Sequence, residues 1–238
     1  MRIDVLTLFP KMFVCVLGES ILKRAQAKGL LEIKVHNLRE WTSDSHRTAD
    51  DKPFGGGPGM VMKVEPVYLA LRQLKSKRSK AKGQRPRIIL LTPQGKKLNQ
   101  SIVKKLTREK RLILICGHYE GVDERIRAFA DEEISIGDYI LTCGEIPALV
   151  LIDAVARMIP GVLGDADSIK SESFENGLLE YPQYTRPADF LGMKVPEVLI
   201  SGDHKKIEAW RKKEALKRTL ERRPDLIKDR KESKWINT

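Results

Sequence analysis

Three glycine-containing segments in the N-terminal two-thirds of the chain have the residue types and positions of a ligand-binding site. They are residues 92–95, 117–121 and 136–145. They begin where short apolar runs end, at Leu91, Cys116 and Ser135. In open α/β sheets ligands bind outside the carboxyl ends of the strands, and glycine lets a backbone approach a ligand closely. One glycine-rich turn between a strand and a helix is common, but three in succession predict a shared site for an adenosine-like ligand, held mainly by backbone contacts.

The sequence lacks the motifs of several common ligand-binding sites, so those kinds of site are not predicted. No G-x-G-x-x-G follows an apolar run and no G-x-x-x-x-G-K-[ST] occurs, which argues against an ordinary dinucleotide site and a P-loop NTPase. Cys15, Cys116 and Cys143 are far apart and odd in number, as expected of reduced thiols in a cytosolic protein. Neither these cysteines nor the histidines have metal-ligand spacing, so no metal site is predicted.

The loop at residues 46–60 is too long to be a bare connection. It combines paired acids, bases and several glycines, and loops of this length inside a compact domain are often functional. Within it, Asp50 has two interpretations that the residues leave open. Its carboxylate could accept hydrogen bonds from the N–H edge of a guanine, or it could cap a turn.

Hydrophobic periodicity predicts the elements that would position these segments. The expected strands are residues 3–8, 31–35, 87–91, 112–116 and 132–136, and the expected helices are residues 12–27, 66–74, 100–110 and 146–159. The alternation predicts an α/β fold with a mostly parallel sheet. The general rules of chain connection predict that such a sheet is open and unknotted.

The charge balance predicts a polyanionic partner. The chain has 44 Lys and Arg against 32 Asp and Glu, a net charge of +12, and clustered cations bind phosphates through counterion release. A merely soluble basic protein is the alternative. The segment 72–87 holds eight Lys or Arg and no acid; it is either a solvated loop or an RNA phosphate contact.

Composition also divides the chain. Residues 1–160 form the predicted sheet domain, residues 161–177 a polar linker, and residues 178–238 a small basic helical domain. Its main helix is expected near residues 204–223, with Ile207, Trp210, Leu216 and Leu220 as its buried stripe. No apolar stretch is long enough to span a membrane, and the N-terminus lacks a signal-peptide layout, so a cytoplasmic protein is expected.

Five strings, in this order and spacing, carry a resemblance to a known family. They are HRTADDKPFGGGPGMVMK, LTPQG, CGHYEGVDERI, EISIGDYILTCGEIPALVLIDAVARMIPGVLG and GLLEYPQYTRP. The chain closely resembles the bacterial tRNA (guanine-N1)-methyltransferases of the SPOUT superfamily, from Asp4 to the basic C-terminal helix. The resemblance implies a SPOUT-type parallel sheet with a deep trefoil knot and a small α-helical C-terminal domain. It also implies a homodimer whose active site uses both subunits.

The resemblance further implies a reaction. S-adenosylmethionine would donate a methyl group to N1 of the guanine immediately 3′ of the tRNA anticodon, when another guanine precedes it. The family is also linked to magnesium. The matching positions for the cofactor are Thr92, Pro93, Gln94, Gly117, Tyr119, Glu120, Gly121, Ser135, Ile136, Gly137, Tyr139, Leu141 and Gly144.

The resemblance also assigns residues to the substrate side. Asp50 and Arg186 match positions near the RNA, Arg157 matches an arginine near the reacting guanine, and Glu172 matches the proposed general base. In the mechanism this implies, Glu172 removes the N1 proton and Arg157 stabilises the charge that develops on O6. Without the resemblance, Arg157 is better explained by an ion pair with Asp153 at i, i+4.

Three residues depart from the family pattern. Glu172 stands where Asp is usual, which keeps the carboxylate on a longer stem. Cys143 stands where glycine is usual, which is harmless unless the position needs a positive φ. His118 stands where Arg is common, which puts any phosphate contact there in doubt.

Two other functions compete with this one. A non-catalytic RNA-binding module would keep the basic residues but would have no need of three ligand-binding segments. A SPOUT enzyme with another RNA target, such as a ribose 2′-hydroxyl, would leave the matches at Asp50 and Glu172 unexplained.

Overall fold

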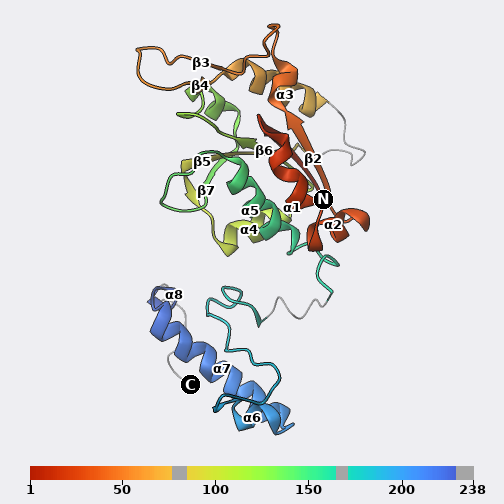
Figure 1. Ribbon diagram of the computed structural model, residues 1–238, viewed down its shortest axis with the longest axis vertical. Coiled ribbons are helices and arrows are strands. Elements are labelled where there is room, and N and C mark those ends of the chain that lie inside the picture. Colours follow the sequence, from red (N-terminus) through yellow and green to blue (C-terminus); the bar gives the residue numbers. More distant parts are fainter. Residues whose placement is uncertain (77–84, 165–170, 229–238) are drawn as a thin grey trace. The chain divides into compact units, whose positions relative to one another are not determined.

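Five parallel strands form the central sheet of the chain. The computed structural model places them in the order β2-β1-β6-β5-β7 (Figure 1). Their bounds are β1 (Arg2–Thr7), β2 (Glu32–Asn37), β5 (Arg87–Lys97), β6 (Arg111–Cys116) and β7 (Glu132–Ser135). The prediction of an α/β fold with a parallel sheet is confirmed.

The structure describes residues 1–76, 85–164 and 171–228. Residues 77–84 of the basic segment 72–87 and residues 165–170 of the predicted linker lie outside these ranges. The chain divides into two units, Met1–Gly164 and Asp165–Thr238, each of which is described by itself. Within the described ranges, no helix has both the length and the apolar character needed to cross a membrane.

Both faces of the sheet are buried, because side chains alternate along each strand. On β5, Ile89 and Leu91 face one apolar cluster, while Ile88 and Leu90 face another. The first cluster is covered by helices α2 (Ser20–Ala27), α4 (Gln100–Thr107) and α5 (Glu145–Ala156). The second is covered by α3 (Val64–Ser76) and the 3-10 turns η2 (Leu38–Trp41) and η3 (Glu124–Phe129). The near-continuous apolar runs of the strands are the expected result of this two-sided burial.

Strand β5 continues beyond its predicted end. The sequence predicts a strand that ends at Leu91, followed by the glycine-containing segment at residues 92–95. Instead these residues interrupt the strand, which pairs with β7 at Leu91, shifts register, and pairs again at Lys96 and Lys97. A Cβ on Gly95 would lie 2.4 Å from the Ile134 nitrogen, so the close approach of the two backbones requires glycine here.

The single helix expected over residues 12–27 is wrong. The segment forms η1 (Pro10–Phe13), α1 (Val14–Leu17) and, after a break, α2. Ser20, the first residue of α2, has a φ of 50° in the left-handed region, so the chain cannot pass through it as one continuous right-handed helix. The spacing of apolar residues does not reveal this break, because the residues before and after Gly18 both follow a helical pattern.

The second unit contains a short hairpin and helices. Its elements are β8 (Asp189–Phe190), β9 (Met193–Lys194), α6 (Glu197–Ile200), α7 (His204–Arg222) and α8 (Asp225–Lys228). The predicted buried stripe of α7 is wrong at Leu216 and Leu220, which are exposed, whereas Thr219 is fully buried. The Thr219 hydroxyl accepts a hydrogen bond from the Leu179 N–H at 2.9 Å and donates one to the Ala215 carbonyl at 2.6 Å. A polar contact therefore helps to hold α7 against the segment that contains Leu179. Apolar periodicity cannot predict such a contact.

Candidate active site

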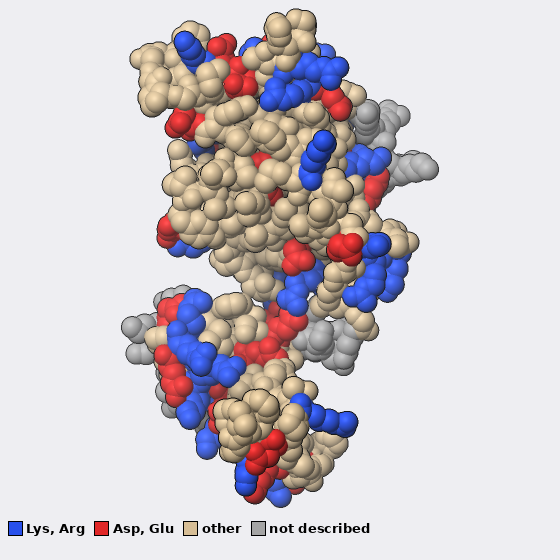
Figure 2. Space-filling model, viewed as in Figure 1, with Lys and Arg blue, Asp and Glu red and all other residues tan. Residues whose placement is uncertain are grey.

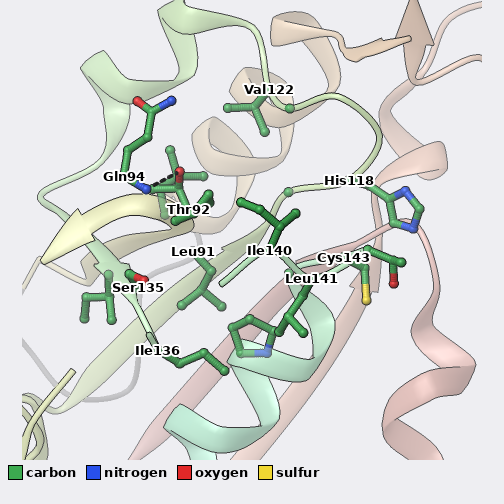
Figure 3. Close-up of a pocket in the computed structure, with 18 of the residues that line it drawn as sticks. Leu91, Thr92, Gln94, His118, Val122, Ser135, Ile136, Ile140, Leu141 and Cys143 are labelled. Carbon is green, nitrogen blue, oxygen red and sulfur yellow. Dashed lines mark hydrogen bonds between the residues drawn. The ribbon is translucent and has the colours of Figure 1, made fainter. Parts of the chain in front are cut away.

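A cavity of about 340 Å³ lies beside the interruption of β5 and at the carboxyl ends of β6 and β7 (Figure 3). All three glycine-containing segments contribute to its wall. The predicted cofactor residues that line it are Thr92, Pro93, Gln94, Gly117, Tyr119, Glu120, Gly121, Ser135, Ile136, Gly137, Tyr139, Leu141 and Gly144. The structure thus gathers in one place every residue that the sequence assigned to the cofactor, and their role in binding it stays a prediction.

Two of the three segments touch each other directly. The Gly144 N–H donates to the Gly117 carbonyl at 2.7 Å, and His118 and Cys143 form an isolated antiparallel bridge. A Cβ on Gly144 would lie 2.6 Å from the Gly117 nitrogen and 2.8 Å from the Cys116 Cα. No side chain fits there, so glycine at position 144 is needed for the contact itself.

Beneath this contact, the end of β1 is tied to the start of α5. The Thr7 hydroxyl donates to Glu145 Oε1 at 2.5 Å, and both residues are fully buried. Burial raises the pKa of the neighbouring Cys116 thiol well above its usual range, and the negative charge of Glu145 acts in the same direction. A buried thiol with a raised pKa is a poor nucleophile, so Cys116 is a structural residue.

The departures at His118 and Cys143 are accommodated without strain. Cys143 is nearly buried and does not have a positive φ, so replacement of the usual glycine is harmless. The His118 ring packs against Phe9, with ring centroids 4.7 Å apart, and its Nδ1 accepts a hydrogen bond from the Tyr119 N–H at 2.9 Å. His118 therefore contributes to the wall of the cavity.

Asp50 lies beside the cavity rather than in its lining. It belongs to β3 (Asp50–Asp51), which pairs antiparallel with β4 (Val61–Met62). Burial raises the pKa of Tyr119, and the Asp50 carboxylate raises it further, while Arg39 acts in the opposite direction. Asp50 and Arg39 are thus the charged residues whose opposing effects act on the Tyr119 phenol.

Arg127, which no sequence motif singles out, also lines the cavity. Arg127 of η3 donates to Gln94 Oε1 at 2.8 Å and to Glu124 Oε2 at 2.8 Å, and it also contacts Glu133. Burial lowers the pKa of Arg127, but Glu124 and Glu133 outweigh burial and raise it. Neither motif nor periodicity distinguishes Arg127 from other surface arginines, because its contact with the cavity residue Gln94 spans 33 residues of sequence.

Arg157 does not line the cavity of its own chain. The cavity lies at the start of α5, whereas Arg157 caps the other end of this helix. A helix of this length separates its ends by about 18 Å at 1.5 Å per residue. Arg157 instead borders an apolar groove with Val16, Leu149 and Val150.

The other two predicted residues belong to the second unit. Glu172 is half-buried in a turn, where its carbonyl accepts a hydrogen bond from the Glu175 N–H at 3.2 Å. Arg186 is exposed and precedes Pro187 across a cis peptide bond. In the described parts of both units, no group of three or more His, Cys, Asp or Glu side chains is arranged to hold a metal ion.

Known proteins match the chain over nearly its whole length. The family model described as tRNA (Guanine-1)-methyltransferase TrmD matches residues 1–229. A tRNA (guanine-N(1)-)-methyltransferase of Dictyoglomus turgidum is 58% identical over 227 residues, which cover 95% of this chain and 90% of that protein. A protein of the same name from Endomicrobium trichonymphae is 56% identical over 232 residues, which cover 96% of this chain and 100% of that protein. The chain therefore belongs to the tRNA (guanine-1)-methyltransferase family, a family of enzymes.

Proposed function

We propose that this protein transfers a methyl group from S-adenosylmethionine to N1 of the guanine immediately 3′ of the tRNA anticodon, when another guanine precedes it. The observation that carries the proposal is the convergence of the three glycine-containing segments on one cavity, which residues from 92–94, 117–121 and 136–144 line. Membership of the tRNA (guanine-1)-methyltransferase family supports the reaction type and the base.

The cavity suits the proposed cofactor in size and chemistry. Its volume is within the usual range for small-molecule sites. Leu91, Ile136 and Leu141 offer apolar surface for a nucleoside, and the hydroxyls of Thr92 and Ser135 lie among them (Figure 3). When bound, S-adenosylmethionine would supply an electrophilic methyl group on its sulfonium, and the neutral thioether that leaves needs no proton.

The protein then has two tasks at the guanine. N1 carries a proton and is a poor nucleophile, so the Glu172 carboxylate would accept that proton. Negative charge moves onto O6 as the proton leaves, and the Arg157 guanidinium would stabilise it, because fixed charge is most effective where charge develops. Magnesium has no assigned site in this scheme.

We further propose that the site is completed by a second copy of the chain. Within one chain, α5 separates Arg157 from the cavity by most of its length. Arg157 borders a groove whose apolar side chains are exposed, including Val16 and Val150. A two-fold axis through this face would bring Arg157 of each copy toward the other copy. We also propose that the chain forms the deep trefoil knot that the sequence resemblance implies.

The second unit is proposed to bind the anticodon stem–loop. Basic side chains gather over α7 (Figure 2). Aromatic rings accompany them: Arg211 lies 4.8 Å above the Tyr181 ring, and the rings of Tyr184 and Trp210 are 6.4 Å apart. Cations with nearby aromatic rings suit single-stranded RNA, where phosphates and unstacked bases are both accessible. The proposed roles are cofactor binding for residues 1–160, linkage for residues 161–177 and tRNA binding for residues 178–238.

Transfer of a tritiated methyl group tests the proposal. The purified protein is given labelled S-adenosylmethionine and an anticodon stem–loop transcript with two consecutive guanines at the target, beside a transcript whose target guanine is adenine. Label in the first transcript alone, located at N1 by nuclease digestion and chromatography, is the expected result. Label in neither, with the cofactor bound, would point to another RNA target. Failure to bind the cofactor would favour a non-catalytic RNA-binding module.

A further inference from the structure

The loop between β3 and β4 (Figure 1) carries Phe54, whose side chain is fully exposed. Phe54 occupies a tight turn, in which the Gly56 N–H donates to the Pro53 carbonyl at 3.2 Å and Gly55 has a φ of 87°. A Cβ added at Gly55 or Gly56 would have no neighbour within 4 Å, so the turn projects into open space. Phe54 therefore does not stabilise the fold of this unit.

The base of the same loop is fixed to the wall of the cavity. The Glu120 N–H donates to the Met60 carbonyl at 3.1 Å, and the Met62 N–H donates to the Gly121 carbonyl at 3.0 Å. The Glu120 side chain packs over Gly59 so closely that a Cβ there would lie 2.4 Å from its Cγ. The loop that carries Phe54 thus begins at the rim of the cavity.

We propose that Phe54 stacks on an unpaired base next to the target guanine in the RNA loop. The inference rests on the proposed function, because it assumes that a guanine enters this cavity. A base that leaves its stack exposes the face of its neighbour, and aromatic side chains commonly cover such faces. Lys52, exposed and two residues away, offers a cation for the adjoining phosphate. Stacking needs only a planar ring, so Phe54 positions the RNA and leaves base recognition to other groups.

Three replacements at one position separate an aromatic contact from a general apolar one. Phe54→Ala and Phe54→Leu should each weaken binding of the stem–loop about tenfold, as expected for loss of one base–aromatic stack. Phe54→Tyr should bind like the wild type. All three should keep the wild-type melting temperature and the wild-type affinity for S-adenosylhomocysteine by calorimetry, because the side chain is fully exposed and does not line the cavity.

An RNA-side control identifies the stacking partner. Stem–loops with an abasic nucleotide at each unpaired position in turn are bound to wild type and Phe54→Ala, and the Phe54→Ala penalty should vanish at one position beside the target. A penalty that persists at every position would overturn the proposal, as would full binding by Phe54→Leu. A shift of Phe54→Ala from dimer to monomer in sedimentation would also overturn it, because a second copy would then be the partner. Methyl transfer by the wild type reports on the proposed function separately from these variants.

Discussion

Arg127 fixes the orientation of the Gln94 side chain, because its guanidinium donates to Gln94 Oε1 at 2.8 Å. A guanidinium has no acceptor, so the amide oxygen must face Arg127 and the NH2 group must face elsewhere. Both residues line the cavity. Gln94 is therefore held as a hydrogen-bond donor before any ligand binds.

Loss of this arginine should weaken cofactor binding. In Arg127→Met the Gln94 amide can rotate freely, so we expect the KM for S-adenosylmethionine to rise about tenfold, in line with one charge-assisted hydrogen bond, while kcat changes little. Arg85→Met is the matched control, because Arg85 is exposed and pairs with Asp131 away from the cavity. An equal rise in KM in both variants would mean that the effect is one of general charge.

Glycine at position 144 should be indispensable for ligand binding in the cavity. In Gly144→Ala the new methyl group would overlap the Gly117 backbone, so residues 117–121 and 137–144 must separate. We expect loss of measurable S-adenosylhomocysteine binding by calorimetry and a lower melting temperature. Gly164→Ala provides the comparison, because its Cβ would meet nothing within 4 Å. Wild-type binding by Gly144→Ala would show that the contact between the two segments is dispensable.

Glu172→Gln should abolish turnover without affecting binding. The amide has the size of the carboxylate but cannot accept the N1 proton, so we expect kcat to fall by about 10²–10⁴-fold. Affinities for tRNA and S-adenosylhomocysteine should stay at wild-type values. Glu175→Gln in the same turn is the control, and Glu172→Asp should retain activity. Near-normal turnover in Glu172→Gln would refute its role as the base.

Mixed dimers can show whether Arg157 acts on the partner's cavity. Neither Arg157→Ala nor the cavity variant Gly144→Ala should be active alone. If each site takes Arg157 from the opposite copy, an equal mixture of the two chains should recover about a quarter of wild-type activity, because random pairing yields one intact site in each mixed dimer. Recovery should require exchange of subunits. No recovery after proven exchange would assign Arg157 to its own chain or to a structural role.

Asp4 should make stability depend on pH in the acid range. It is fully buried beside Arg2, His36 and Arg111, at 2.8, 2.8 and 2.9 Å. Burial raises its pKa, but the hydrogen bonds from these three residues outweigh burial and hold the pKa far below its usual value. A carboxyl with a lower pKa in the folded state stabilises the fold above its unfolded pKa of about 4 and loses that contribution as the pH falls further.

Urea unfolding between pH 7 and pH 2 measures this contribution. Asp4→Asn leaves the buried Arg111 without its counter-charge, so we expect a loss of about 3–5 kcal/mol at pH 7 and a shallower decline toward acid pH. Asp138→Asn, at an exposed pair with Lys97, should change neither quantity appreciably. A slope in Asp4→Asn that matches the wild type would assign the acid sensitivity to other carboxyls.

Much of the sheet and the cavity could be predicted from the sequence, because strand ends and glycines are local features. Apolar runs such as 112–116 fix a two-sided buried strand, and the glycines after them identify the edge where a ligand can approach. The strand break at residues 92–95 could not be predicted, because it depends on the contact of Gly95 with β7. The role of Arg127 could not be predicted for the same reason, since Gln94, the acceptor that matters for the cavity, lies 33 residues away in the sequence.

The interruption of β5 has a consequence for how a ligand leaves the cavity. The ladder with β7 holds the chain immediately before residues 92–95 and again immediately after them. Displacement of this segment would break backbone hydrogen bonds at both ends. A ligand that left past β5 would therefore have to break part of the ladder with β7, so this wall of the cavity should stay in place while a product is released.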